Sequence, residues 1–139
     1  MKITSVKAFQ AHLPYVGGTY FWGRGHAIRN ALTTVIAVET DAGISGCGES
    51  CPIGGNYLAA YPEGVIPALA RLAPAVIGQD PRHLHRIEGL MDEALKGHPY
   101  AKSALDAACW DILGQDCGQP VSILLGGVLT DGGPMYRVV

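Results

Sequence analysis

The stretch AKSALDAACWDILG, residues 101–114, decides the fold of this chain. Its apolar residues recur at intervals of three and four, the spacing that places side chains along one face of an α-helix. They are Ala101, Ala104, Leu105, Ala108, Cys109, Ile112 and Leu113. The sequence therefore predicts a helix that begins near Pro99, buries this face, and is ended by Gly118 and Pro120.

Two shorter helical patterns lie on the N-terminal side of this stretch. After Pro62, apolar residues at helical spacing predict a helix that Pro74 should end or kink. Its buried face would contain Val65, Ile66, Leu69, Leu72, Ala73 and Val76. Residues 82–95 predict a further helix, which Gly97 ends. Its buried face would contain Leu84, Ile87, Met91, Ala94 and Leu95.

The N-terminal third has the pattern of a β-sheet. Residues 2–13 and 32–40 read as strands, and β-branched residues dominate the second of them. The link Asp41-Ala42-Gly43 is typical of a tight turn and leads into a third strand, residues 44–49. We therefore expect an α+β fold, in which a three-stranded antiparallel meander is followed by a three-helix bundle.

The composition excludes several classes of function. A length of 139 residues fits one domain, and a net charge of −2 lacks the basic excess that nucleic-acid binding requires. No stretch is long and apolar enough to span a bilayer, and residues 1–15 lack the apolar core of a signal peptide. We expect a cytoplasmic protein with no nucleic-acid or membrane partner. Because 48% of residues are hydrophobic and only 16% charged, part of the surface should meet a partner.

The order of these elements resembles the N-terminal domain of the mandelate racemase and muconate lactonising enzymes, a group of the enolase superfamily. The resemblance covers essentially the whole chain. It rests on residues 1–4 (MKIT), 40–49 (TDAGISGCGE), 101–114 and 118–127 (GQPVSILLGG). Two further segments are most similar to cis-3-hydroxyproline dehydratases and to hydroxyproline or proline-betaine epimerases. They are residues 49–57 (ESCPIGGNY) and 97–102 (GHPYAK).

The resemblance implies a reaction that this chain would not perform alone. In the family, a base removes the proton α to a carboxylate while Mg²⁺ stabilises the enolate. The metal ligands and bases come from the strand ends of a (β/α) barrel, so no catalytic or metal-binding residue is assigned here. Residues 1–133 would form the capping domain, and residues 134–139 the first strand of a barrel that the sequence stops before completing. The implied partners are this barrel and a small carboxylate substrate.

Two glycine-containing loops, residues 14–27 and 50–62, carry the candidate substrate-binding residues. In the first loop, Tyr20 and Trp22 could close over a substrate and exclude water, or could simply pack on the domain. In the second loop, Gly54-Gly55 would allow close approach of the backbone. The residues there that could reach a substrate are Ile53 and Tyr57, although an ordinary surface turn would have the same sequence.

Other polar residues are less informative. Arg24 and His26 lie at the base of the first loop and are interpreted as solvated groups rather than substrate ligands. Asp106 and Asp111 belong to the helix motif and should anchor the helix rather than catalyse.

The alternative function is a non-catalytic module that oligomerises or binds a partner without any barrel. The enzyme hypothesis requires a continuation of about 200 residues or more, so the mass of the natural polypeptide separates the two. We also expect a homo-oligomer, formed through the surface that should meet the barrel and through residues 135–139.

Overall fold

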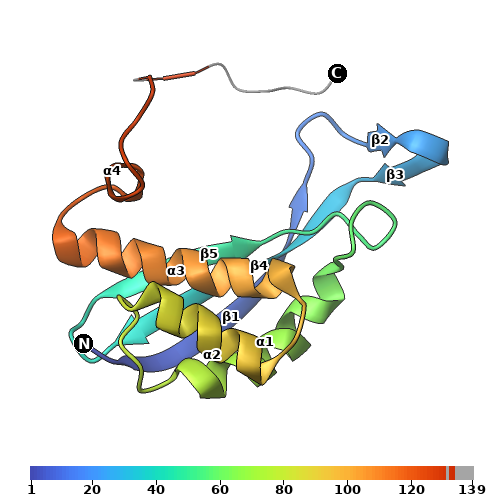
Figure 1. Cartoon of the computed structure of the whole chain (residues 1–139). Helices are drawn as coiled ribbons and strands as arrows, with labels where there is room; N and C mark the ends of the chain where they lie inside the picture. Colours follow the sequence, from blue (N-terminus) through green and yellow to red (C-terminus); the bar gives the residue numbers. More distant parts are fainter. Residues whose placement is uncertain (131, 134–139) are drawn as a thin grey trace.

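The fold, seen in a computed structural model that describes residues 1–130 and 132–133, is a three-stranded sheet covered on one face by helices (Figure 1). The expected strand at residues 134–139 lies outside the described residues. The strands are β1 (Ile3–Pro14), β2 (Tyr20–Trp22), β3 (His26–Ile28), β4 (Asn30–Thr40) and β5 (Ser45–Ser50). The helices are α1 (Val65–Val76), α2 (Leu84–Ala94), α3 (Pro99–Cys117) and the short α4 (Val121–Leu124).

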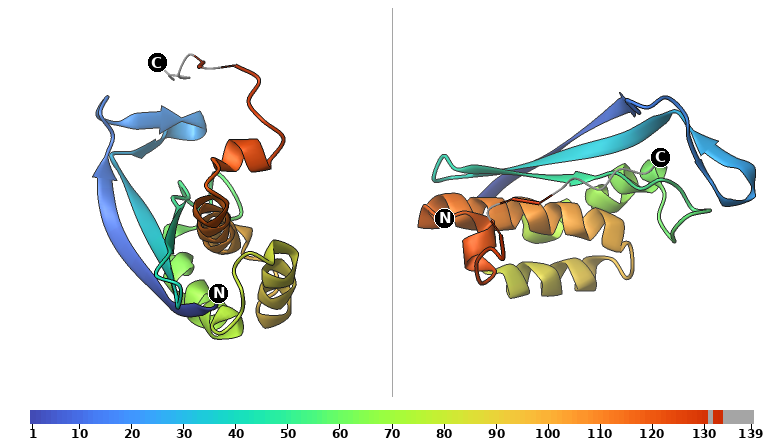
Figure 2. Two further views of the ribbon diagram at one scale, coloured as in Figure 1. Left: turned by 90° about the vertical axis from the view of Figure 1, so that its left-hand side faces the viewer. Right: turned by 90° about the horizontal axis from the view of Figure 1, so that it is seen from above.

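The main sheet has the order β1-β4-β5 with antiparallel pairing throughout, so the predicted meander and the α+β class are confirmed. Figure 2 shows α3 lying along this sheet, with α2 on the outer side of α3. Alternate residues of β4, including Ile36 and Val38, are fully buried against the helices. They pack into one core with residues of all three long helices, such as Leu72, Met91 and Leu105. We call this sheet and α1–α3 the body.

Glycines let β5 lie directly on α3. A Cβ at Gly46 would collide with the carbonyl oxygen of Ala108, and a Cβ at Gly48 with that of Ala104. The two backbones can therefore touch only because these four positions carry no side chain or a methyl group. This contact explains why the two motifs, residues 40–49 and 101–114, occur together.

Polar groups of α3 also satisfy the free edge of β5. The Cys47 backbone N–H donates to Asp111 Oδ2 at 2.9 Å, and Gln115 Nε2 donates to the Ser45 carbonyl oxygen at 2.8 Å. An edge strand whose N–H and C=O groups are paired in this way is protected from pairing with another chain. The expected anchoring role of Asp111 is confirmed.

Several predicted details of the helices are wrong by a few residues. Ile66 is exposed rather than buried, because it faces away from the stripe formed by Val65, Leu69 and Leu72. Helix α1 continues two residues past Pro74, which lies in its last turn, where the ring can point to solvent. Helix α2 begins at Leu84 rather than at residue 82 and ends before Leu95, whose backbone is extended.

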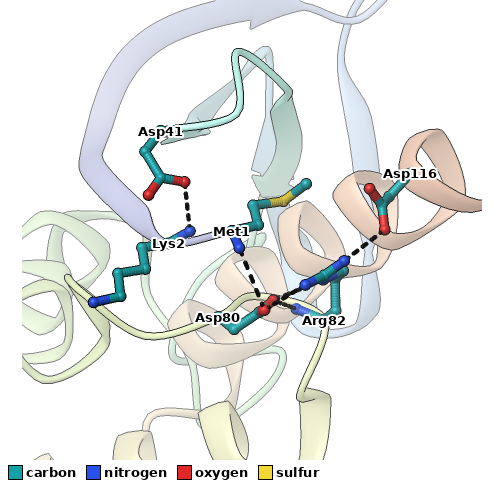
Figure 3. A network of polar contacts seen from close by, with 6 residues as sticks. All are labelled: Met1, Lys2, Asp41, Asp80, Arg82 and Asp116. Atoms are coloured by element: carbon teal, nitrogen blue, oxygen red, sulfur yellow. Dashed lines mark hydrogen bonds and ion pairs between the residues drawn. The ribbon is translucent and has the colours of Figure 1, made fainter.

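An ion-pair network at the start of the chain joins three segments (Figure 3). Asp80 accepts hydrogen bonds from Arg82 Nε at 2.9 Å and from its Nη2 at 2.7 Å, and the Met1 ammonium group lies 3.7 Å away. Arg82 also donates to Asp116 in α3 at 3.0 Å. The Arg82 guanidinium holds the pKa of Asp80 well below its usual range. This network joins the residue at the start of the chain and the segment between α1 and α2 to the end of α3.

Within the part of the chain that the structure describes, no helix combines the length and the apolar character that crossing a bilayer requires.

Candidate functional site

The first loop contains a small β-hairpin that the sequence analysis did not predict. Strands β2 and β3 pair antiparallel, with Trp22 opposite His26, around a turn at Gly23–Gly25. Arg24 and Gly25 both have positive φ, at 64° and 77°, which permits a turn this tight. Figure 1 shows the hairpin projecting beyond the ends of α1–α3. We call this hairpin and the second loop, residues 50–62, the tip.

Stacked rings run along one side of the hairpin. Tyr15, just before it, stacks on Tyr20 with ring centres 5.9 Å apart. Tyr20 stacks on Trp22 at 6.0 Å, and Trp22 on the His26 imidazole at 5.4 Å. Successive residues of a strand face opposite sides, so Phe21 is excluded from the stack and is 70% exposed. Alternation along the strand therefore places a row of stacked rings on one side of the hairpin.

The second loop contacts this row of rings. The Tyr57 ring meets Trp22 edge to face, with centres 6.1 Å apart. Beside it, the Asn56 side-chain amide donates to His26 Nδ1 at 3.0 Å. These contacts bring together residues that lie 30 or more positions apart, so the two predicted loops form one surface.

The tip includes polar groups in an apolar setting. The Trp22 indole N–H is buried and has no hydrogen-bond acceptor among the described residues. Partial burial, followed by the neighbouring Cys51 and Tyr20, raises the pKa of the Tyr15 phenol. Tyr15 therefore stays neutral to a higher pH than usual.

Three of the four predicted residues, Tyr20, Trp22 and Tyr57, lie together at the tip. Ile53 is half-buried in the same loop and takes no part in the ring contacts. His26 was interpreted as a solvated group, but it is half-buried between Trp22 and Asn56. The sequence contained one signal for the position of His26. Aromatic residues at the alternate positions 20 and 22 are typical of a β-strand, and this strand would pair with the residues that follow Gly25.

No group of three or more acidic, histidine or cysteine side chains within residues 1–130 and 132–133 is arranged to hold a metal ion. The described residues therefore do not fit a Mg²⁺ site. A hollow of about 880 Å³ lies at the opposite end of the body, beside Lys2, Asp80 and Arg82. Because Asp80 and Arg82 are bonded to each other there, we interpret it as part of the framework.

Comparison with known proteins identifies relatives of this arrangement. The chain is 46% identical over all 139 residues to cis-3-hydroxy-L-proline dehydratase from Roseibium aggregatum, of which it spans 38%. A mandelate racemase/muconate lactonizing enzyme from Roseovarius nubinhibens has a TM-score of 0.95 and 53% identity, and the match covers 99% of this chain and 37% of that one. An enolase superfamily member from the same organism, complexed with magnesium, has a TM-score of 0.84 and 41% identity, over 91% of this chain and 34% of that one.

The chain thus spans little more than a third of the length of the relatives it matches. Residues 24–126 match the family described as mandelate racemase/muconate lactonizing enzyme, N-terminal domain. This segment includes β3, the second loop and the contact between β5 and α3, and it begins after β2. The chain therefore belongs to the mandelate racemase/muconate lactonizing enzyme family and represents its N-terminal domain.

Proposed function

We propose that this domain caps the barrel of a Mg²⁺-dependent enzyme and supplies the loops that select its substrate. The reaction would be removal of a proton α to a carboxylate, in a dehydratase, racemase or epimerase. Residues 1–133 would be the capping domain, and the barrel would be its partner. The metal and the catalytic bases would belong to the barrel, so no step through the metal is assigned to the residues of this chain.

The observation that carries the proposal is the joining of two loops into one aromatic surface at the tip. Tyr20, Trp22 and Tyr57 come from separate segments, and their rings meet outside the core of the body. Binding sites are commonly built from loops that a rigid scaffold positions. A surface of this kind can cover a small substrate and exclude water from the developing enolate.

We propose a proline derivative as the substrate. The support is the relative from Roseibium aggregatum, named as a cis-3-hydroxy-L-proline dehydratase, whose match includes both loops. A ring with a cationic nitrogen suits the aromatic faces of Tyr20 and Trp22, because such faces attract cations. Ile53, in the same loop as Tyr57, would supply an apolar contact to the ring carbons.

A proton-exchange experiment tests the proposal. The 139-residue chain and the polypeptide that joins it to a barrel are each incubated in deuterated water with Mg²⁺ and cis-3-hydroxy-L-proline. We expect loss of the substrate or exchange of its α proton with the joined polypeptide and not with this chain alone. Exchange by this chain alone would contradict the capping role.

The same preparation decides between the enzyme and the alternative, a binding or oligomerising module. A natural polypeptide whose mass is that of this chain alone would favour the module. If the joined polypeptide is inactive on proline derivatives but acts on another α-carboxylate, only the substrate assignment is wrong.

A further inference from the structure

Helix α2 has a glycine at the centre of its exposed face. Ile87 is fully buried, and Gly89 lies two residues later, about 200° around the helix. Figure 2 shows α2 as the outermost helix, with α3 between it and the sheet. A Cβ built at Gly89 would meet no atom within 4 Å. Glycine is among the least favoured residues in a helix interior, and the packing of a single chain gives no reason for it here.

The charges that lie within about 60° of Gly89 around the helix divide at this residue, and the exposed Glu88 lies outside this sector, at about 100°. His85 and Arg86 lie one turn before it, and Asp92 and Glu93 lie one turn after it. All four are exposed. At about 100° per residue, Arg86 and Glu93 lie on one side of the line through Gly89, and His85 and Asp92 lie on the other. Each side of the face therefore has a basic position in its first half and an acidic position in its second half.

This arrangement is complementary to itself under a two-fold rotation. If two copies of α2 lie antiparallel across an axis at Gly89, Arg86 of each copy meets Glu93 of the other. On the other side, His85 meets Asp92 in the same way. A two-fold interface uses the same patch on both subunits, and two glycines at its centre would let the backbones approach closely. We propose that α2 is the interface with a second copy of this chain.

The contacts within one chain leave these groups able to pair. Arg86 uses Nε to bind Gln79 at 3.0 Å, which leaves its two terminal nitrogens. Asp92 binds Lys102 through Oδ1 at 2.6 Å, which leaves Oδ2. The Nδ1 of His85 lies 3.9 Å from Glu88, too far for a strong bond. No ion pair within the described residues involves Glu93. Pairing of Arg86 with Glu93 should therefore contribute most to the interface.

Charge reversal tests the proposal on this chain by analytical ultracentrifugation at low ionic strength. In R86E, positions 86 and 93, which face each other across the interface, are both glutamate. In E93R, the same two positions are both arginine. We expect each variant alone to dissociate at least about tenfold more readily than the unmodified chain. An equimolar mixture of R86E and E93R places opposite charges together again and should restore association. The R86E/E93R double variant should also associate.

The control R71E makes the same charge change on α1, where Arg71 is exposed, and should associate as the unmodified chain does. A monomeric unmodified chain, or equal association of R86E, E93R and the unmodified chain, would overturn the proposal. Gly89→Cys gives a second measurement that does not depend on charge. Under oxidation we expect a disulfide between the two copies at position 89, mapped by mass spectrometry, and its absence in an associated chain would contradict an axis at this residue.

Discussion

The body and the tip are stabilised by different kinds of contact. In the body, β5 and α3 touch backbone to backbone at Gly46 and Gly48, and residues such as Leu105 are fully buried. In the tip, half-exposed rings stack, and one side-chain hydrogen bond joins Asn56 to His26. A packed core tolerates little change, whereas an exposed ring surface can vary with little loss of stability. The comparison indicates that stability resides mainly in the body, and the specificity that we propose would reside in the tip.

The largest loss of stability is expected from Leu105→Ala in the centre of the body. Leu105 has no exposed surface, so the change would leave a cavity and cost about 3–4 kcal/mol in the free energy of unfolding. Tyr57→Ala, at a residue 48% exposed in the tip, should cost about 1 kcal/mol or less. Denaturant unfolding followed by circular dichroism measures both. Equal losses would show that the tip is part of the core.

Gly48→Ala should have the next largest effect. Its methyl group would collide with the Ala104 carbonyl oxygen, so β5 must move away from α3, at a cost of about 2–3 kcal/mol. The matched control is Gly55→Ala in the tip, where a Cβ meets nothing within 4 Å. The control should change the free energy of unfolding by less than about 0.5 kcal/mol. A neutral Gly48→Ala would refute the direct contact of the two backbones.

Acid should weaken the body through Asp80. Because its folded-state pKa is lowered, its contribution is complete above the unfolded-state pKa and is lost as the pH falls below that value. Charge-assisted hydrogen bonds of this kind contribute about 1–2 kcal/mol. Unfolding measured from neutral to strongly acidic pH should therefore show a shallower acid loss in Asp80→Asn than in the unmodified chain. Identical pH profiles would exclude the Asp80–Arg82 pair as a source of acid sensitivity.

The smallest effect is expected from Asn56→Ala in the tip. The hydrogen bond that it removes, from the Asn56 amide to His26, is exposed to water, so the free energy of unfolding should change by less than about 0.5 kcal/mol. Thermal unfolding provides the measurement. A loss above about 1 kcal/mol would mean that this bond supports the fold, and the contrast between tip and body would then fail.

The sequence predicted the body better than the tip, for a physical reason. Periodic burial determines the helix in residues 99–117 and the strands around Ile36. This period can be read directly from the spacing of the apolar residues. Two predictions for α1 were wrong, the burial of Ile66 and the end of the helix at Pro74. Both concern the ends of the helix, where burial and length depend on neighbouring elements. The close contact at Gly46 and Gly48 was not predicted, because two segments must first be known to meet before the need for glycine becomes apparent.

The tip could be predicted only as loops with aromatic residues. Its hairpin is held by three residue pairs around a turn in which a non-glycine residue, Arg24, has positive φ, and sequence gives weak warning of such a turn. The stacking of Trp22 on His26 depends on this pairing, so His26 was assigned to solvent. Tyr20, Trp22 and Tyr57 were predicted as substrate-binding residues of two separate loops; the structure places their rings together, and their role toward a substrate remains a proposal.

The most direct test of the account compares Trp22→Ala with Phe21→Ala in the polypeptide that joins this domain to its barrel. Both remove a large ring from β2, but only Trp22 lies in the aromatic stack, and Phe21 faces the opposite side. We predict that Trp22→Ala lowers kcat/KM on the enzyme's own substrate at least about tenfold, while the affinity for Mg²⁺ and the thermal stability change little. Phe21→Ala should leave all three quantities nearly unchanged. Loss of Mg²⁺ affinity in parallel with activity, or full activity in Trp22→Ala, would contradict the assignment of specificity to the tip.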